Sequence, residues 1–145
     1  MRRLSIALFV GLLALTSGVL VAQPASAALG DWYYDGRDPT ATGCVNDART
    51  IDSKAVGGGA TIYLRYSPSC RTTWARITGA ATRTADRAGG SALIYREQDG
   101  AGIRCYTGSG TACSTNMVYD GGFTSHATGT NDVGWTIYRA TTISY

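Results

Sequence analysis

The feature that most constrains the fold is a pair of alternating segments at residues 60–78, separated by the short turn "SPSC". In the first segment, "ATIYLRY", Ile62 and Leu64 alternate with Tyr63 and Arg65, and "TWARIT" continues the alternation after the turn. Successive side chains of a β-strand point to opposite faces of its sheet. One face of both segments is therefore apolar, and the other carries arginine and aromatic side chains. The pattern predicts an antiparallel hairpin with one buried face.

Other segments of strand length lie between closely spaced glycines and are rich in threonine and tyrosine, which favour strands. We expect strands near residues 48–52, 60–66, 72–78, 91–97, 102–107, 115–119 and 134–143. Residues 121–132 lack any alternation and are expected to form a surface loop. Helical turns near residues 46–56 and 80–88 are the alternative to extended structure there. The sequence thus predicts one mainly β domain, a small antiparallel sandwich or barrel-like fold.

Residues 1–27 have the composition of a secretory signal peptide. Arg2 and Arg3 precede the apolar run "LSIALFVGLLAL", and small residues at Ala25 and Ala27 fit a signal-peptidase site. We expect cleavage after Ala27, export by the general secretion route, and residues 28–145 as a single extracellular domain. The small-residue end argues against a retained anchor. No later segment is long and apolar enough to span a membrane, so we expect no membrane contact after cleavage.

The charge of the chain is small and consists mostly of arginine. Thirteen Lys and Arg against ten Asp and Glu give a net charge of +3, and loss of Arg2 and Arg3 with the leader lowers it to +1. A near-neutral surface offers no electrostatic footprint for nucleic acid. Lys54 is the only lysine, and guanidinium groups suit ring stacking and bidentate pairing better than ammonium groups. We expect a monomer that binds no nucleic acid.

The four cysteines, Cys44, Cys70, Cys105 and Cys113, all lie after the leader. An even number of cysteines in an exported domain predicts two disulfides, which can be connected in three ways. We favour Cys44–Cys70 and Cys105–Cys113, because each bond closes a local loop that a hairpin can bring together. A four-cysteine zinc site would need closely spaced pairs of the CxxC type, which are absent. We expect no metal or cofactor.

Several motifs occur together in the first half of the domain: "GRDPTATGC", then "NDA", "LRYSPSC" and "TWARITG". Over residues 35–80 they resemble the YjfA-like family of small secreted, mainly actinobacterial proteins, a domain of unknown function. The resemblance implies an exported β-rich domain and a disulfide between Cys44 and Cys70. It implies no activity. Cys105 and Cys113 lie outside the motifs that carry the resemblance.

The arginine and aromatic face of the hairpin is the first candidate binding surface. If exposed, its side chains form a cation–π ladder for a sugar ring or a protein. Alternatively, they stabilise the sheet as cross-strand pairs or lie under a loop. The stretch "DWYYDGRDP" at residues 31–39 is a second candidate, although Asp38 is also typical of a turn that caps the Pro39 segment. The candidate contacts are Trp32, Tyr34, Tyr63, Arg65, Trp74 and Arg76.

Two other classes of protein are alternatives. Glu97 and His126 are the only glutamate and the only histidine, and such a base–acid pair would serve a small secreted hydrolase or ribonuclease, although no motif of such an enzyme is present. The tetrapeptide "MVYD" at residues 117–120 resembles the reactive loop of secreted subtilisin inhibitors, with Met117–Val118 as the bond that faces the protease. The sequence favours a non-catalytic secreted protein that binds cell-wall carbohydrate or another secreted protein.

Overall fold

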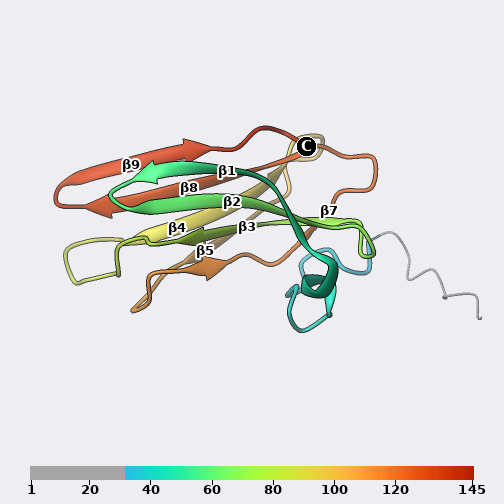
Figure 1. The fold of residues 1–145 in the computed structure, drawn as a ribbon, viewed down its shortest axis with the longest axis horizontal. Coiled ribbons are helices and arrows are strands. Elements are labelled where there is room, and N and C mark those ends of the chain that lie inside the picture. Colours follow the sequence, from blue (N-terminus) through green and yellow to red (C-terminus); the bar gives the residue numbers. More distant parts are fainter. Residues whose placement is uncertain (1–31) are drawn as a thin grey trace, which may run out of the picture.

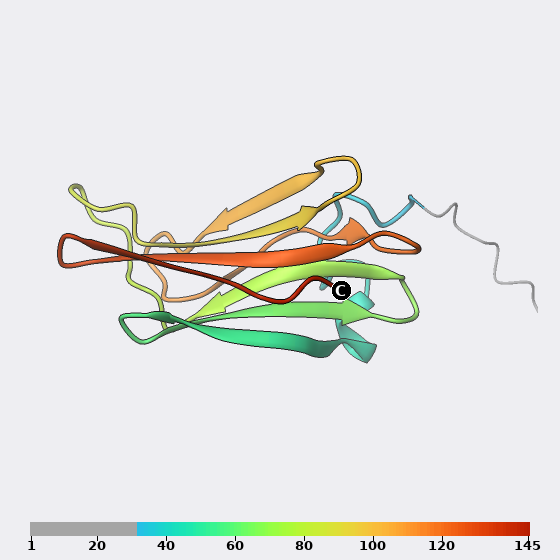
Figure 2. The ribbon, with the colours of Figure 1, turned by 90° about the horizontal axis from the view of Figure 1, so that it is seen from above.

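The computed structural model describes residues 32–145, so the predicted signal peptide lies outside the described residues. In this part of the chain, strands form two antiparallel sheets that pack face to face (Figures 1 and 2). A 3₁₀ helix, η1 (Cys44–Asp47), precedes the first strand. The strands are β1 (Arg49–Gly57), β2 (Ala60–Ser67), β3 (Thr72–Thr78), β4 (Gly90–Arg96), β5 (Gly102–Tyr106), β6 (Cys113–Ser114), β7 (Val118–Tyr119), β8 (Ser125–Val133) and β9 (Thr136–Thr141).

The order of strands in the first sheet is β1–β2–β3–β6, and β7 also pairs with β3. The order in the second sheet is β5–β4–β8–β9. The mainly β prediction is therefore confirmed, and of the two arrangements expected, the sandwich is the one observed. No helix in residues 32–145 is long and apolar enough to cross a membrane.

The predicted hairpin is formed by β2 and β3, with Tyr63 opposite Arg76 across the two strands. Its apolar face is completely buried at Ile62, Leu64 and Ile77. These side chains pack against the second sheet, where Ile94 of β4 belongs to the same core cluster. Burying one aliphatic side chain contributes about 1.5–3 kcal/mol. The alternation in the sequence was thus a direct signal of the sandwich core.

The surface loop predicted at residues 121–132 is wrong, because residues 125–133 form β8 between β4 and β9. This strand faces the core with small or polar side chains where the two sheets approach closely. A Cβ atom at Gly129 would lie 2.9 Å from Ile62 Cβ and from Val56 Cγ2. Asn131 is fully buried, accepts a hydrogen bond from the Ala81 N–H (2.7 Å) and donates to the Gly57 carbonyl (2.9 Å). Large apolar side chains do not alternate along β8, because the two sheets are too close there to accommodate them.

The other expected elements differ from the structure at their boundaries. Residues 46–56 mostly form β1 instead of a helical turn, and residues 80–88 form a loop. The strand expected at 115–119 is observed only at its end, as β7 (Val118–Tyr119), and β6 stops just before it at Ser114. Between them, the backbone N–H of Thr115 donates to the Ala75 carbonyl (2.9 Å), and its hydroxyl accepts from the Ala75 N–H (3.1 Å).

The two disulfides connect Cys44 with Cys70 and Cys105 with Cys113, with Cα–Cα distances of 5.9 and 6.0 Å. This is the connectivity favoured from the sequence, and the first bond is the one that the family resemblance implied. The first disulfide ties η1 to the β2–β3 turn. The second ties β5 of one sheet to β6 of the other.

Candidate functional site

Residues 32–48 lie against the outer face of the first sheet, on the side away from the core. Trp74 of β3 points to this side and packs with the Cys44–Cys70 disulfide, Met117 and Tyr34. The backbone of the segment also pairs with the strand region near β7. The Gly36 N–H donates to the Met117 carbonyl (2.8 Å), and the Met117 N–H donates to the Arg37 carbonyl (2.9 Å). The segment is therefore held in place along its length.

Arg96, at the end of β4, fixes the start of this segment. Its side chain is only 2% exposed and donates to Asp35 Oδ1 (2.8 Å) and, with two nitrogens, to the Asp99 carboxylate (2.9 and 2.6 Å). The Trp32 and Phe123 rings lie 4.6 and 5.1 Å from its guanidinium carbon. Hydrogen bonds from Arg96 lower the pKa of Asp99 to about 2. A buried guanidinium with two carboxylates is a stable anchor because its donors are satisfied.

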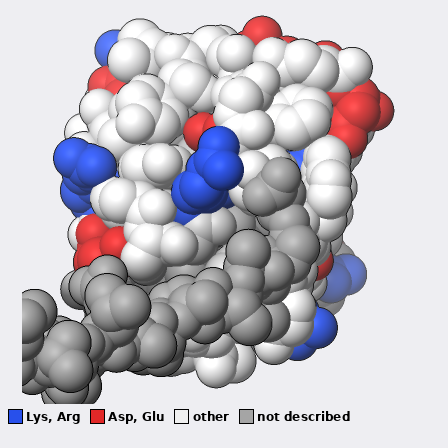
Figure 3. Space-filling model, turned by 90° about the vertical axis from the view of Figure 1, so that its right-hand side faces the viewer, with Lys and Arg blue, Asp and Glu red and all other residues white. Residues whose placement is uncertain are grey.

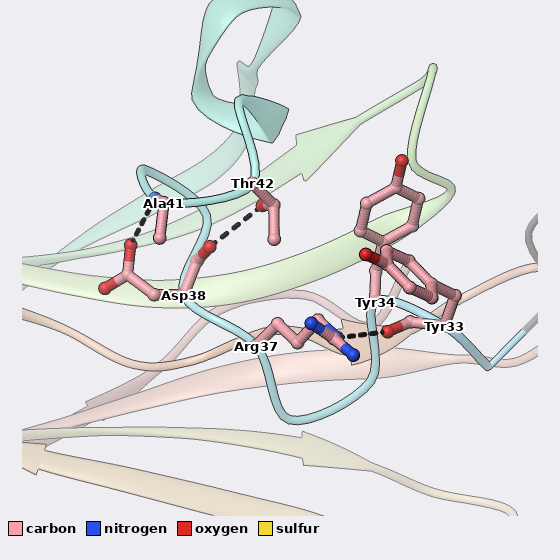
Figure 4. A pocket seen from close by; sticks show the side chains of 6 residues that line it. All are labelled: Tyr33, Tyr34, Arg37, Asp38, Ala41 and Thr42. Carbon is pink, nitrogen blue, oxygen red and sulfur yellow. Dashed lines mark hydrogen bonds between the residues drawn. The ribbon is translucent and has the colours of Figure 1, made fainter.

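A hollow of about 460 Å³ lies within this segment, where residues 33 and 34 face the turn at Asp38 (Figure 4). Figure 4 shows the Tyr33 and Tyr34 rings on one side and Asp38 on the other. The two rings meet edge to face with centroids 4.9 Å apart, and the Arg37 guanidinium stacks 4.2 Å from the Tyr33 centroid. The lining residues are Tyr33, Tyr34, Arg37, Asp38, Ala41 and Thr42.

Asp38 forms the turn that shapes this hollow. Its Oδ1 accepts hydrogen bonds from the backbone N–H groups of Thr40 (2.7 Å) and Ala41 (2.9 Å). The prediction that Asp38 caps the Pro39 segment is therefore confirmed. Because one oxygen is held by the backbone, the orientation of the carboxylate toward the hollow is fixed.

A second hollow of about 210 Å³ shares Asp38 with the first and lies against the hairpin face. Arg65 donates to Thr50 Oγ1 (2.7 Å) and to the Ala48 carbonyl (3.3 Å), and Arg76 donates to Ser114 Oγ (3.5 Å). The lining residues are Asp38, Pro39, Thr40, Val45, Arg65, Trp74, Arg76 and Ser114. Half of the hollow thus comes from β2, β3 and β6, and half from the segment over them.

Four of the six predicted contact residues line the two adjoining hollows: Tyr34, Arg65, Trp74 and Arg76. Trp32 instead stacks on Arg96, and Tyr63 lies opposite Arg76 but lines neither hollow. Of the alternatives for the hairpin face, burial under a loop is the one observed at Trp74, which is 2% exposed beneath the segment. Sequence reasoning missed Arg37, although its position between two tyrosines and Asp38 was the available signal. It also missed Arg96, for which no signal existed.

The structure contradicts the exposure that an inhibitor's reactive bond requires at Met117–Val118. Met117 is completely buried, and Val118 is 1% exposed. Both backbone groups of Met117 pair with the segment at residues 36–37, and Val118 begins β7. A protease could not reach this bond without local unfolding.

Glu97 and His126, which are far apart in the sequence, do come together. His126 Nδ1 lies 3.1 Å from Glu97 Oε1, and the Ser144 hydroxyl donates to the same carboxylate oxygen. These hydrogen bonds, from Ser144 first and then from His126, lower the pKa of Glu97. In a nucleophile–base–acid relay the imidazole lies in the middle. Here the Glu97 carboxylate lies in the middle, between Ser144 and His126, so the histidine does not activate the serine.

No group of three or more His, Cys, Asp or Glu side chains within residues 32–145 is arranged to hold a metal ion. The side chains that line the adjoining hollows offer hydrogen bonding, ion pairing and ring stacking. Fold and site together define a small two-sheet sandwich with two disulfides and an arginine and tyrosine surface beside the first disulfide.

Comparison with known proteins identifies the family. The profile described as "Protein of unknown function (DUF2690)" matches residues 33–128, and the chain belongs to this family. The chain is also 30% identical over 115 residues to "Uncharacterized protein YjfA" of Bacillus subtilis (strain 168), a match that covers 70% of this chain and 73% of that protein. No solved structure matches. The family match extends beyond residue 80, where the sequence motifs ended, and includes the second disulfide.

Proposed function

We propose that the protein is an exported, non-catalytic binding protein whose ligand is an extracellular glycan, bound where the two hollows meet at Asp38. A sugar ring has an apolar C–H face, which stacks on aromatic rings, and hydroxyl groups, which need fixed donors and acceptors. Tyr33 and Tyr34 supply the rings, Arg37 supplies donors and Asp38 supplies an acceptor. The meeting of these groups in one hollow is the observation that supports the proposal most strongly.

The size of the hollow favours a glycan over a second secreted protein. Its volume of about 460 Å³ lies within the roughly 300–1,000 Å³ typical of small-ligand sites. A stable protein partner would instead cover about 800 Å² on each side. A short stretch of a polysaccharide fits the two hollows without requiring a large flat surface.

The rigidity of the surrounding segment supports the same conclusion. The Cys44–Cys70 disulfide and the Arg96–Asp35 ion pair hold the two ends of the segment that forms the hollow. A preformed site loses less conformational entropy when it binds than a flexible loop does. Export also agrees with the two disulfides, because such bonds persist in oxidising compartments.

Co-sedimentation with insoluble polysaccharides tests the proposal. We expect the disulfide-bonded protein to be retained on bacterial cell walls, and we expect chitin and cellulose to show whether neutral glycans suffice. Tyr33→Ala should weaken retention roughly two- to twelvefold, because one ring stacking contact contributes about 0.5–1.5 kcal/mol. Tyr106→Ala is the matched control, since Tyr106 is 61% exposed on β5 and lines neither hollow. Absence of retention on all three polymers, or equal loss in both variants, would contradict the proposal.

A further inference from the structure

In the part of the chain that the structure describes, the arginines around the two hollows have no acidic partners. Within residues 32–145, no ion pair joins Arg37, Arg65 or Arg76 to a carboxylate. Their hydrogen bonds go to neutral oxygens: the Tyr33 carbonyl for Arg37, Thr50 and Ala48 for Arg65, and Ser114 for Arg76. A guanidinium has five N–H donors, so most donors of these three side chains remain available to a ligand.

The acidic residues of the same segment are already engaged elsewhere. Asp35 pairs with Arg96. Asp47 accepts from the Ser67 hydroxyl (2.6 Å) and the Ser69 N–H (2.8 Å), and these hydrogen bonds lower its pKa. Among the described residues, Asp38 is the one acid that lines the hollows, and its Oδ1 accepts hydrogen bonds from two backbone N–H groups. The positive charge of the three arginines is thus only partly compensated.

We infer that the ligand is an anionic glycan, and that its carboxylate or phosphate group lies between Arg65 and Arg76 in the smaller hollow while a sugar ring contacts Tyr33 and Tyr34 in the larger one. This inference rests on the proposed function and adds the chemical class of the ligand. Arginine is suited to such a role because its planar donors match the oxygens of carboxylate and phosphate. Charge-assisted hydrogen bonds are also stronger than neutral ones.

Nucleic acid, the other common polyanion, fits the surface less well. Binding along its backbone requires a continuous basic track. The chain carries a net charge of only +3. On the face drawn in Figure 3, basic and acidic side chains are scattered among uncharged ones. A single pair of arginines beside a tyrosine hollow suits one anionic group on a sugar.

The test uses cell walls of Bacillus subtilis in four forms: untreated, depleted of phosphate polymers with hydrofluoric acid, amidated at their carboxylates with carbodiimide, and treated in both ways. Chitin and single-stranded DNA–cellulose complete the set. We expect retention on untreated walls and at least a tenfold loss after the double treatment. The two single treatments show whether phosphate or carboxylate is the anion.

Arginine variants locate the anion. Arg76→Gln should weaken retention on untreated walls at least about tenfold, because the variant loses a hydrogen bond to a charged group. Arg76 is exposed and its one hydrogen bond is long at 3.5 Å, so the variant should fold normally. Arg65→Gln should act in the same direction. Arg104→Gln is the control, because Arg104 is also exposed but lies on β5, outside both hollows.

The outcomes separate the two proposals. Retention that persists after the double treatment, or that Arg76→Gln and Arg104→Gln reduce equally, would overturn the anionic ligand and leave glycan binding intact. Stronger retention on DNA than on walls would overturn the glycan assignment. Failure to bind any wall preparation or chitin would overturn both.

Discussion

Arg96 determines where residues 32–48 lie, although nothing in the sequence distinguishes it from the other arginines. It is almost completely buried and joins β4 to Asp35, Asp99 and the Tyr119 carbonyl. A strand predicted from alternation is expected to bury apolar side chains, and Arg96 departs from that rule. Asp99 lies only three residues away, but Asp35 and Tyr119 are 61 and 23 residues away, so only the folded structure reveals the whole cluster.

Arg96→Met should lower the free energy of unfolding by about 1.5–3 kcal/mol, because it removes charge-assisted hydrogen bonds and leaves the buried Tyr119 carbonyl without this donor. Urea denaturation followed by tryptophan fluorescence measures the change. Arg104→Met, at an exposed position on β5, should change stability by less than about 0.5 kcal/mol. Similar small losses in both variants would contradict the role assigned to Arg96.

Asp120 should make stability depend on pH. Burial raises its pKa to about 6, while hydrogen bonding from Ser125 and the charge of Arg96 act in the opposite direction. Because this pKa exceeds the unfolded value of 3.8, the folded state binds the proton more tightly. The resulting stabilisation is fully present below pH 4 and is lost as the pH rises through 6. It amounts to roughly 3 kcal/mol.

Asp120→Asn removes this titration and keeps an oxygen for Ser125. The free energy of unfolding of the variant, relative to the unsubstituted protein, should therefore rise by up to roughly 3 kcal/mol between pH 4 and pH 7. Urea midpoints at several pH values measure it, with the exposed Asp86→Asn as control. A difference that is the same at pH 4 and pH 7 would show that Asp120 does not titrate in this range.

At the scale of elements, β2, β3 and β8 show what a sequence pattern can predict. The hairpin was predicted because large apolar side chains alternate with polar ones. β8 was missed because it lies where the sheets are closest, and only glycine, alanine and small polar residues fit there. A strand that buries only small residues shows no alternation of large apolar and polar side chains. Its place in the sheet is determined by pairing with the neighbouring strands, which the sequence pattern does not reveal.

Gly129→Ala tests this explanation. The new methyl group would meet Ile62 and Val56 at 2.9 Å, and overpacking of this kind costs about 1–3 kcal/mol. Thermal or urea unfolding measures the loss. Gly102→Ala is the control on β5, where the nearest atoms lie at an ordinary 3.5 Å. An unchanged stability in Gly129→Ala would mean that the sheets are farther apart than described.

The two disulfides should differ in their effect on the site. Replacing Cys44 and Cys70 with serine should cost about 3.5 kcal/mol, and replacing Cys105 and Cys113 about 2.5 kcal/mol, because the first pair closes the longer loop. Only the first pair holds the segment over Trp74. Retention on cell walls at a temperature where both variants are folded should therefore fall in the first variant alone. Equal retention of the two variants would show that binding does not depend on the segment at residues 32–48.

At the scale of the whole molecule, the sequence predicted the components of the site better than their arrangement. Tyr34, Arg65, Trp74 and Arg76 were identified as residue types suited to binding, and all four line the adjoining hollows. Their assembly depends on a segment without regular structure that crosses the sheet and covers Trp74. No local pattern encodes such a crossing, because it results from a disulfide, a buried ion pair and a few backbone hydrogen bonds.

The most direct test of the binding surface is amide chemical-shift mapping by nuclear magnetic resonance, with soluble fragments of the cell-wall polymer that retains the protein. We predict that the largest shifts lie around Asp38, at Thr40, Ala41 and Arg76. Largest shifts at the hairpin tip near Trp135, which is 91% exposed, or around Glu97 and His126 would place the ligand elsewhere and contradict the account.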